Sequence, residues 1–407
     1  MMNPKIEYRR PEPRHAKDLF QLERRCFPSP WDMGEIQGLI RRDLSLYTLG
    51  AFLGDEPVGY VSATFSEPRA LHVISICVSP DLRNRGIAGN LLSCALQWGR
   101  HLEADRVMLE VREGNVPAIN FYSGFGFRNT GTIADFYGSG INGIFMEKPL
   151  EPIPGTLDTM LFLNSRFARK PRVGVVLGSG LGWATEPFGS GLSIPFGDIP
   201  GMAGNAVEGH AQTLATSEDG DVVFIMGRRH HYQGFSGREI TLLPSALAAL
   251  GVDRWLLTSS AGAVDESFSV GDAMIFTDHL NFSGCIPDPP LRDIGDTVYS
   301  STLQELASEV IEDSLKGVFA CVSGPAYETA AEVDFIRKAG CRAVSMSTAQ
   351  EALALRSLGC SVLALALITN EVKSGESVCH EEVLSAQDTL RKRQETSLVR
   401  IIERLKS

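Results

Sequence analysis

Residues 173–182 read VGVVLGSGLG, an apolar run that leads directly into a glycine-rich turn with one hydroxyl group. A continuous apolar run of this kind is typical of a strand buried on both faces of an α/β sheet. The turn can hold a phosphate through its backbone N–H groups and the Ser179 hydroxyl. It is neither a Walker A motif, which needs Gly-Lys-Ser/Thr, nor a dinucleotide fingerprint, whose third glycine is missing. The stretch predicts the fold class and leaves the ligand open.

Further apolar runs alternate with helical segments after this strand. This alternation predicts an α/β domain with buried strands. The last helix is expected from about His380 and carries an amphipathic stripe of Leu398, Ile401, Ile402 and Leu405. The other predicted strands of this domain are residues 222–226, 255–258, 273–276, 318–322, 343–346 and 361–368.

A domain boundary is indicated by three prolines and a glycine within residues 149–155. We therefore expect a first domain over residues 1–150, a proline-rich linker over 151–171 and a second domain over 172–407. Helical spacing of apolar residues over 157–168 predicts a short helix in the linker. The first domain has predicted strands at 47–52, 57–65, 70–78 and 106–111, and predicted helices at 86–102 and 116–123.

The charge of the chain is unevenly distributed. Of 38 Lys+Arg and 49 Asp+Glu residues, residues 1–150 hold 17 of each, so residues 151–407 carry the whole net charge of −11. This acidic balance gives no support for a nucleic-acid partner. The eight cysteines form no C-x-x-C pair, which favours a reducing cytoplasm. No apolar run is long enough to span a membrane and no ligands cluster at metal-site spacing, so we expect neither a membrane nor a metal.

A second phosphate-binding turn is predicted in the first domain. Residues 83–88 read RNRGIA and stand between a predicted strand and a predicted helix. The small residues Gly86 and Ala88 let the backbone approach a ligand closely. The free N–H groups and the dipole of a helix start suit a diphosphate.

The motifs VMLEVREGN (residues 107–115) and AINFYSGFGF (118–127) follow this turn. Together with Pro30-Trp31 and Asp135-Phe-Tyr137, they make residues 5–149 resemble the GNAT acetyltransferases, and within them the ribosomal-protein N-terminal alanine acetyltransferases. The resemblance implies a mixed sheet with helices and acetyl-CoA as co-substrate. It implies transfer of the acetyl group to an amine, with the N-terminal amine of a protein, such as a ribosomal protein, as the first choice. A small-molecule amine is the alternative.

The resemblance also implies direct attack of the amine on the thioester, with Glu110 matching the family's base and Tyr122 its acid. The residues alone leave two other interpretations open. Glu110 can be a strand-edge carboxylate paired with an arginine, and Tyr122 a packed aromatic beside Phe121 and Phe125. The implied acetyl-CoA contacts are the main chain of Ile76 and Val78, followed by Arg83, Arg85, Gly86, Ala88 and Asn115.

The second domain carries a series of polar motifs in a fixed order. They are VEGHA (207–211), GRRHHYQG (227–234), TSSAG (258–262), GPAYET (324–329), SMST (345–348), ITN (368–370) and HEEV (380–383). In this order, residues 172–400 resemble the trimeric, low-molecular-mass class of purine nucleoside phosphorylases. The resemblance implies a mixed sheet flanked by helices, inorganic phosphate as co-substrate, purine nucleosides as substrates and a homotrimer formed through this domain.

Phosphorolysis needs a held phosphate dianion, a ribose that becomes oxocarbenium-like and a purine anion stabilised at its ring nitrogens. His210 is expected near the phosphate as an orienting or proton-handling group. The implied phosphate ligands are Ser179, Arg228, His230 and Ser347, with the backbone around Ser260 and Ala261. The implied nucleoside contacts are Tyr232, Met346 and His380 at the ribose, and Tyr327, Glu328 and Asn370 at the purine.

Asn370 carries the prediction of substrate choice, because its amide can donate to N7 beside a 6-oxo group. The aspartate of the related methylthioadenosine phosphorylases favours a 6-amino purine, so inosine and guanosine are expected here. The sequence also departs from the family at Ser259-Ser260, in place of an Asn-Ala pair, and at Tyr327, in place of Phe. Phe282 is the candidate for the aromatic that the family sends into a neighbouring subunit. Two alternatives stay open: methylthioadenosine phosphorolysis, and one half that only senses acetyl-CoA or nucleoside.

Overall fold

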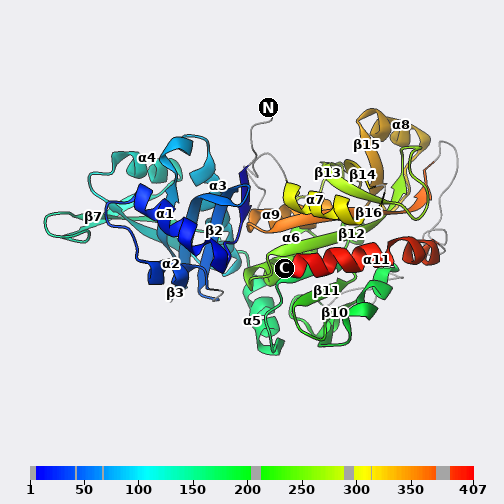
Figure 1. Ribbon diagram of the computed structural model, residues 1–407, viewed down its shortest axis with the longest axis horizontal. Coiled ribbons are helices and arrows are strands. Elements are labelled where there is room, and N and C mark those ends of the chain that lie inside the picture. Colours follow the sequence, from blue (N-terminus) through cyan, green and yellow to red (C-terminus); the bar gives the residue numbers. More distant parts are fainter. Residues whose placement is uncertain are drawn as a thin grey trace. The chain divides into compact units, whose positions relative to one another are not determined.

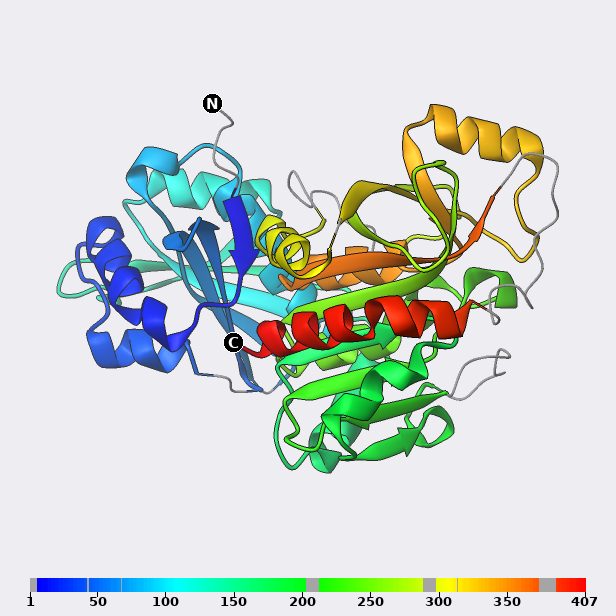
Figure 2. The same ribbon diagram turned by 45° about the vertical axis from the view of Figure 1, so that its right-hand side comes forward.

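The computed structural model describes residues 6–41, 44–66, 68–202, 212–287, 298–312, 314–372 and 386–407. The chain forms two compact units, Met1–Leu157 and Asp158–Ser407, each built on its own sheet (Figure 1 and Figure 2). Both units combine helices with a mixed sheet, which confirms the expected α/β class. The division between the units falls within α5 (Thr156–Arg166), which occupies part of the predicted linker.

The first unit contains a seven-stranded sheet in the order β1-β2-β3-β4-β5-β7-β6. Neighbouring strands run antiparallel except β4 and β5, which are parallel. The strands are β1 (Ile6–Arg9), β2 (Leu46–Leu53), β3 (Glu56–Ser66), β4 (Ala70–Val78), β5 (Arg106–Arg112), β6 (Arg128–Ile133) and β7 (Gly143–Pro149). The helices are α1 (Ala16–Cys26), α2 (Met33–Leu39), α3 (Ile87–His101) and α4 (Val116–Gly124).

Helices bury apolar stripes against this sheet. The α3 helix packs on β2, β3 and β4, and its buried residues include Leu91, Leu92 and Trp98. The α1 helix buries Leu19 and Leu22 against β3 and β4, and α2 packs against α1 and β2. Because α3 begins immediately after the loop that follows β4, its packing fixes the position of the predicted diphosphate turn.

The second unit contains a nine-stranded mixed sheet in the order β15-β14-β13-β16-β12-β8-β11-β10-β9. Parallel pairing joins β8 to both β11 and β12, and joins β12 to β16. The strands are β8 (Val173–Leu177), β9 (Ser193–Pro195), β10 (Thr213–Thr216), β11 (Val222–Met226), β12 (Arg254–Ala263), β13 (Ala273–Asn281), β14 (Leu315–Cys321), β15 (Cys341–Ser345) and β16 (Ser361–Glu371). The helices after α5 are α6 (Gly237–Ala249), α7 (Ser301–Val310), α8 (Ala330–Lys338), α9 (Ala349–Ser357) and α11 (Gln387–Lys406).

One end of this sheet curls back on itself. The register between β12 and β16 shifts between Ala261 and Gly262, and the last residues of β12 also pair antiparallel with β15. A bulge of this kind bends a strand and re-aims its side chains. The closure brings the chain around Ser260 next to the end of β15, where Ser345 stands.

The central strands are almost wholly apolar, as expected for strands covered on both faces. The α11 helix lies along one face of the sheet, where it contacts β8 and β16 (Figure 1). Capping boxes fix the starts of α6 and α8, at Ser236 with Glu239 and at Thr329 with Glu332. Within the ranges described, no helix has the length and apolar content needed to cross a bilayer.

Candidate active sites

The first unit has a split between two parallel strands. The β4 strand pairs with β3 along its whole length, whereas it pairs with β5 only at Ala70, Leu71 and His72. Residues 73–78 therefore present one edge that no described strand covers. Such an edge can bind an extended ligand by main-chain hydrogen bonds. Ile76 and Val78, the predicted pantetheine contacts, lie in this segment.

The predicted diphosphate turn, residues 83–88, contains a glycine at the position where the backbone is left-handed. Gly86 is the N-cap of α3 with φ 79°, a left-handed conformation that glycine adopts without strain. Arg83 is fixed by a hydrogen bond from its Nε to the Val78 carbonyl at 3.2 Å, while Arg85 is exposed. Asn115, further along, caps α4 by accepting a hydrogen bond from the Ala118 N–H at 3.3 Å.

Glu110 projects from β5 beside this split. Its Oε2 lies 2.7 Å from His72 Nε2 on β4, and its backbone carbonyl accepts a 2.9 Å hydrogen bond from the Tyr137 hydroxyl. Burial and the Glu110 charge raise the pKa of Tyr137 to about 12. The partner of Glu110 is thus a histidine rather than the arginine of the alternative interpretation. Sequence reasoning missed His72, because a cross-strand pair is invisible until β4 and β5 are placed side by side.

Tyr122 lies on α4 and is almost completely buried. Its ring contacts Phe121 and Phe127, with centroid separations of 5.3 and 5.7 Å. Burial first, and the nearby Tyr137 second, raise the pKa of Tyr122 above its ordinary value. A phenol in this setting stays protonated at neutral pH, as a proton donor must.

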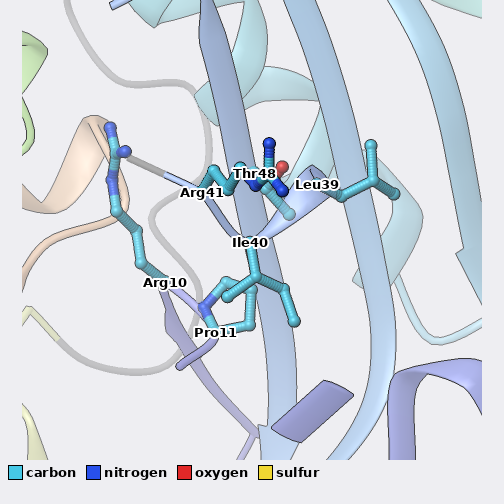
Figure 3. Close-up of a pocket in the computed structure, with 6 residues that line it drawn as sticks. All are labelled: Arg10, Pro11, Leu39, Ile40, Arg41 and Thr48. Atoms are coloured by element: carbon cyan, nitrogen blue, oxygen red, sulfur yellow. The ribbon is translucent and has the colours of Figure 1, made fainter. Parts of the chain in front are cut away.

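The first unit also has a small pocket away from these residues (Figure 3). It is lined by Arg10, Pro11, Leu39, Ile40, Arg41 and Thr48. The Thr48 hydroxyl already forms a 2.7 Å hydrogen bond with Ser62, and Arg41 lies on the surface. The pocket therefore offers no buried polar group to a ligand, and none of the predicted site residues lines it.

In the second unit, the guanidinium group of Arg228 is buried, and its nitrogens differ in their hydrogen bonding. Its Nε donates to Glu351 Oε1 at 3.1 Å, and its Nη1 donates to the Thr258 carbonyl at 3.0 Å and to Ser347 Oγ at 3.2 Å. The side chain is only 5% exposed, yet Nη2 has no hydrogen-bond partner among the described residues. A buried N–H group without a partner is costly, so this nitrogen is suited to an anion.

The glycine-rich turn after β8 stands close to Arg228. The Gly178 N–H donates to Thr258 Oγ1 at 3.1 Å, and Ser260 Oγ donates to the Ser179 carbonyl at 3.1 Å. A Cβ on Gly178 would lie 3.0 Å from the Ser260 nitrogen, so the turn approaches β12 as only glycine allows. The structure thus brings together Ser179, Ser260 and Arg228, three of the predicted phosphate ligands.

Three serine hydroxyls form a hydrogen-bonded network beside Arg228. Ser259 Oγ lies 3.1 Å from Ser345 Oγ and 3.3 Å from Ser347 Oγ. Thr348 follows with φ 81°, which is strained for a β-branched residue. Its N–H donates to Glu351 Oε2 at 3.0 Å, so Glu351 holds both the strained turn and Arg228. Strain of this type persists where the surrounding contacts fix it, often at functional sites.

The predicted ribose contacts lie together. The rings of His230 and Tyr232 stack with centroids 4.9 Å apart. A Cβ on Gly324 would collide with Met346 and approach Tyr232 Cδ1 to 3.1 Å, so these three residues are packed side by side. Burial raises the pKa of the Tyr232 phenol.

The predicted purine contacts come from the end of β16 and from the loop before α8. Asn370 is buried at the end of β16, opposite Gly262 on β12, and its Oδ1 accepts a 3.0 Å hydrogen bond from Thr369. Ala261 precedes Gly262 in β12 and is likewise buried. Glu328 directly precedes the cap of α8, and burial raises the pKa of its carboxyl above the ordinary value.

Two of the predicted residues, His210 and His380, lie outside the described residues. Tyr327 is 37% exposed. The described residues contain no group of three or more His, Cys, Asp or Glu side chains that could hold a metal ion. Glu351 was not predicted from the sequence, although its position three residues after Thr348 is the capping-box signal that identifies it.

Comparisons with known proteins match both units. A model of the phosphorylase superfamily matches residues 172–403, and a model of the acetyltransferase (GNAT) family matches residues 16–127. Purine nucleoside phosphorylase 1 of Geobacillus stearothermophilus is 36% identical over 246 residues, which cover 56% of this chain and 90% of that protein. The purine nucleoside phosphorylase of Rattus norvegicus is 31% identical over 251 residues, covering 56% and 87%.

A solved structure agrees with these matches. The crystal structure of a schistosoma purine nucleoside phosphorylase in complex with hypoxanthine aligns with a TM-score of 0.55 and 27% sequence identity. The alignment covers 61% of this chain and 96% of that chain.

The buried pair of Arg228 and Glu351 leads to a first prediction. Glu351→Gln keeps the size of the side chain but removes its charge and one of the two acceptor oxygens that bond Arg228 and Thr348. We therefore expect a loss of about 3 kcal/mol in the stability of the second unit. Inorganic phosphate should restore more of the melting temperature in this variant than in the wild type, because phosphate then supplies the missing charge. Thermal unfolding with and without phosphate measures both effects.

The matched control is Glu186→Gln, which removes an exposed ion pair with Arg391. This variant should melt at the wild-type temperature, because exposed pairs contribute little. A Glu351→Gln protein that melts like the wild type in phosphate-free buffer would contradict the role given to Glu351.

Proposed function

The chain belongs to the phosphorylase superfamily and combines a GNAT N-acetyltransferase domain with a purine nucleoside phosphorylase domain, and from this premise we propose that its second unit cleaves 6-oxopurine nucleosides with inorganic phosphate. The products are the free purine and ribose 1-phosphate. The observation that carries this proposal is the buried Arg228, whose Nη2 has no hydrogen-bond partner in the described part of the chain, while its Nη1 donates to the Ser347 hydroxyl.

The proposed reaction begins with phosphate bound at Arg228. Ser179, His230, Ser347 and the backbone around Ser260 and Ala261 complete its binding site, with His210 nearby as an orienting or proton-handling group. A phosphate oxygen forms a bond to the ribose C1′ as the bond from C1′ to the purine N9 breaks. The bonding electrons leave with the purine. Tyr232, Met346 and His380 hold the ribose while it carries positive charge.

Asn370 and Glu328 act on the leaving purine in this proposal. The Asn370 amide donates to N7, where negative charge develops, and tolerates an oxygen at position 6. Glu328, as a carboxylate, accepts a purine N–H, and Tyr327 stacks on the ring. Thr369 donates to Asn370 Oδ1 and so helps to fix the orientation of the amide. These contacts favour inosine and guanosine over adenosine derivatives.

The first unit is proposed to transfer an acetyl group from acetyl-CoA to an amine, with the N-terminal amine of a protein, such as a ribosomal protein, as acceptor. Glu110 deprotonates the amine directly or through water, and His72 orients its carboxylate. Tyr122 protonates the departing thiolate. Acetyl-CoA runs along the open edge of β4 at Ile76 and Val78 to the turn of Arg83, Arg85, Gly86 and Ala88, with Asn115 nearby.

We further propose that the protein acts in the cytoplasm as a homotrimer formed through its second unit.

A steady-state assay tests the phosphorolysis. Inosine should release hypoxanthine only when inorganic phosphate is present. Because burial raises the pKa of Glu328, its carboxylate takes up a proton at a higher pH than an ordinary glutamate, and kcat/KM for inosine should fall with it on the acid side. Glu328→Gln should lower kcat/KM at neutral pH by about 10- to 100-fold, as expected for a lost hydrogen bond to a charged group, and remove this acid limb.

Asp334→Asn on the exposed side of α8 is the control and should leave the pH profile unchanged. Wild-type protein that is folded and binds inosine without turning it over would identify a nucleoside-sensing module instead.

Asn370 leads to a separate prediction on substrate choice. Asn370→Asp should shift the ratio of kcat/KM values towards 6-amino purine nucleosides. A carboxyl oxygen accepts a hydrogen bond from a 6-amino group, and a protonated carboxyl group donates one to N7. Rates with inosine, guanosine and methylthioadenosine, each with and without phosphate, measure the shift. Asn370→Ala removes both functions of the amide and should slow all three substrates. An unchanged preference in the aspartate variant would refute the specificity argument.

For the first unit, Glu110→Gln and Tyr122→Phe should each lower the rate of acetyl transfer by about 10²- to 10⁴-fold, the range of general acid–base effects. Transfer from acetyl-CoA to peptides that begin with Ala or Ser measures the rate, and calorimetry should show unchanged acetyl-CoA binding. Glu113→Gln, an exposed neighbour of Glu110, is the control. Binding of acetyl-CoA by the wild type without any transfer would favour a sensing role.

A further inference from the structure

The carbonyl of Ser179 accepts two side-chain hydrogen bonds from distant parts of the chain. Ser260 Oγ on β12 donates at 3.1 Å, and Gln387 Nε2 at the start of α11 also donates at 3.1 Å. Ser179 stands in the turn that is proposed to hold phosphate. A carbonyl oxygen carries partial negative charge, so its direction decides whether the turn attracts or repels a dianion.

Gln387 also touches the backbone of this turn. Gly180 has φ 75°, and a Cβ at this position would collide with the Gln387 side chain. The amide of Gln387 therefore lies directly against the peptide that follows Ser179. The turn is held from one side by β12 and from the other side by α11.

The α11 helix has anchors that do not depend on Gln387. Gln394 is itself buried, and its Nε2 donates to the Gly271 carbonyl at 2.8 Å. The helix also buries Leu390, Leu398, Ile401, Ile402 and Leu405. Loss of the Gln387 amide therefore removes its contact with the turn while these anchors of α11 remain.

We propose that Gln387 is a positioning residue for phosphate binding, an inference that rests on the phosphorolysis proposed above. Its amide and the Ser260 hydroxyl together hold the Ser179 carbonyl away from the anion. The Ser179 hydroxyl and the Gly180 N–H then face the phosphate, since the Gly178 N–H is already bonded to Thr258. In this way the C-terminal helix tunes the affinity for phosphate without touching it.

The test compares the Michaelis constants of the two substrates. Gln387→Ala removes one neutral hydrogen bond and should raise the KM for phosphate about 3- to 10-fold. Gln387→Glu cannot donate when ionised and adds a negative charge, so the rise should be larger than in the alanine variant. The KM for inosine and the melting temperature should stay at their wild-type values in both.

Arg391→Ala is the matched control, because it lies one turn further along α11 and contacts neither Ser179 nor Gly180. Its KM for phosphate should equal that of the wild type. Equal rises in both Michaelis constants, or a lower melting temperature with an unchanged KM for phosphate, would reduce Gln387 to a structural contact and overturn the inference.

Calorimetric titration with inorganic phosphate separates the two levels of the argument. If the wild type neither binds phosphate nor turns over inosine, the proposed function fails. If the wild type binds phosphate and the Gln387→Glu variant binds it equally well, the proposed function stands and the role of Gln387 fails.

Discussion

The burial of the Arg228 guanidinium group constrains how several elements of the second unit pack together. Arg228 cannot be buried without a counter-charge and acceptors for its N–H groups, since an unpaired buried charge is strongly destabilising. Glu351 supplies the charge and the Thr258 carbonyl and Ser347 hydroxyl supply acceptors. These partners come from β12, from α9 and from the turn before α9. The three elements must therefore meet at one point to stabilise the buried cation. Among the described residues, their meeting leaves Nη2 of the guanidinium without a hydrogen-bond partner.

The topology of the sheet makes this meeting possible. The β12 strand lies between β8 and β16, so the turn after β8 and the end of β16 both reach its carboxyl end. The bulge after Ala261 then bends β12 towards β15, which ends at Ser345. Residues separated by more than a hundred positions in sequence thus share one hydrogen-bonded network. In parallel α/β sheets, ligands bind outside the carboxyl ends of the strands, and this network stands at that place.

Helices and strands were predicted well from the sequence, whereas contacts between residues far apart in the chain were not. The apolar run at residues 173–177 corresponds to β8, and the predicted helix at 116–123 corresponds to α4 with a difference of one residue. Such elements follow from local periodicity. Glu351 was missed because a glutamate on a helix is usually exposed, and its counter-charge lies more than a hundred residues away. His72 was missed for the same reason, since its partner Glu110 is defined only by strand pairing.

The two units present different surroundings to the anions that we propose they bind. In the first unit, the N-terminus of α3 follows a left-handed glycine, and an exposed arginine stands beside it. Backbone N–H groups at a helix start bind phosphates while open to water, and salt screens such a site. In the second unit, the Arg228 guanidinium is buried and its charge is compensated by Glu351. Its electrostatic interaction with an anion is therefore strong over a short distance, because little water screens it. For the proposed phosphorolysis, this difference means that the net negative charge of the second unit matters less than the charges immediately around Arg228.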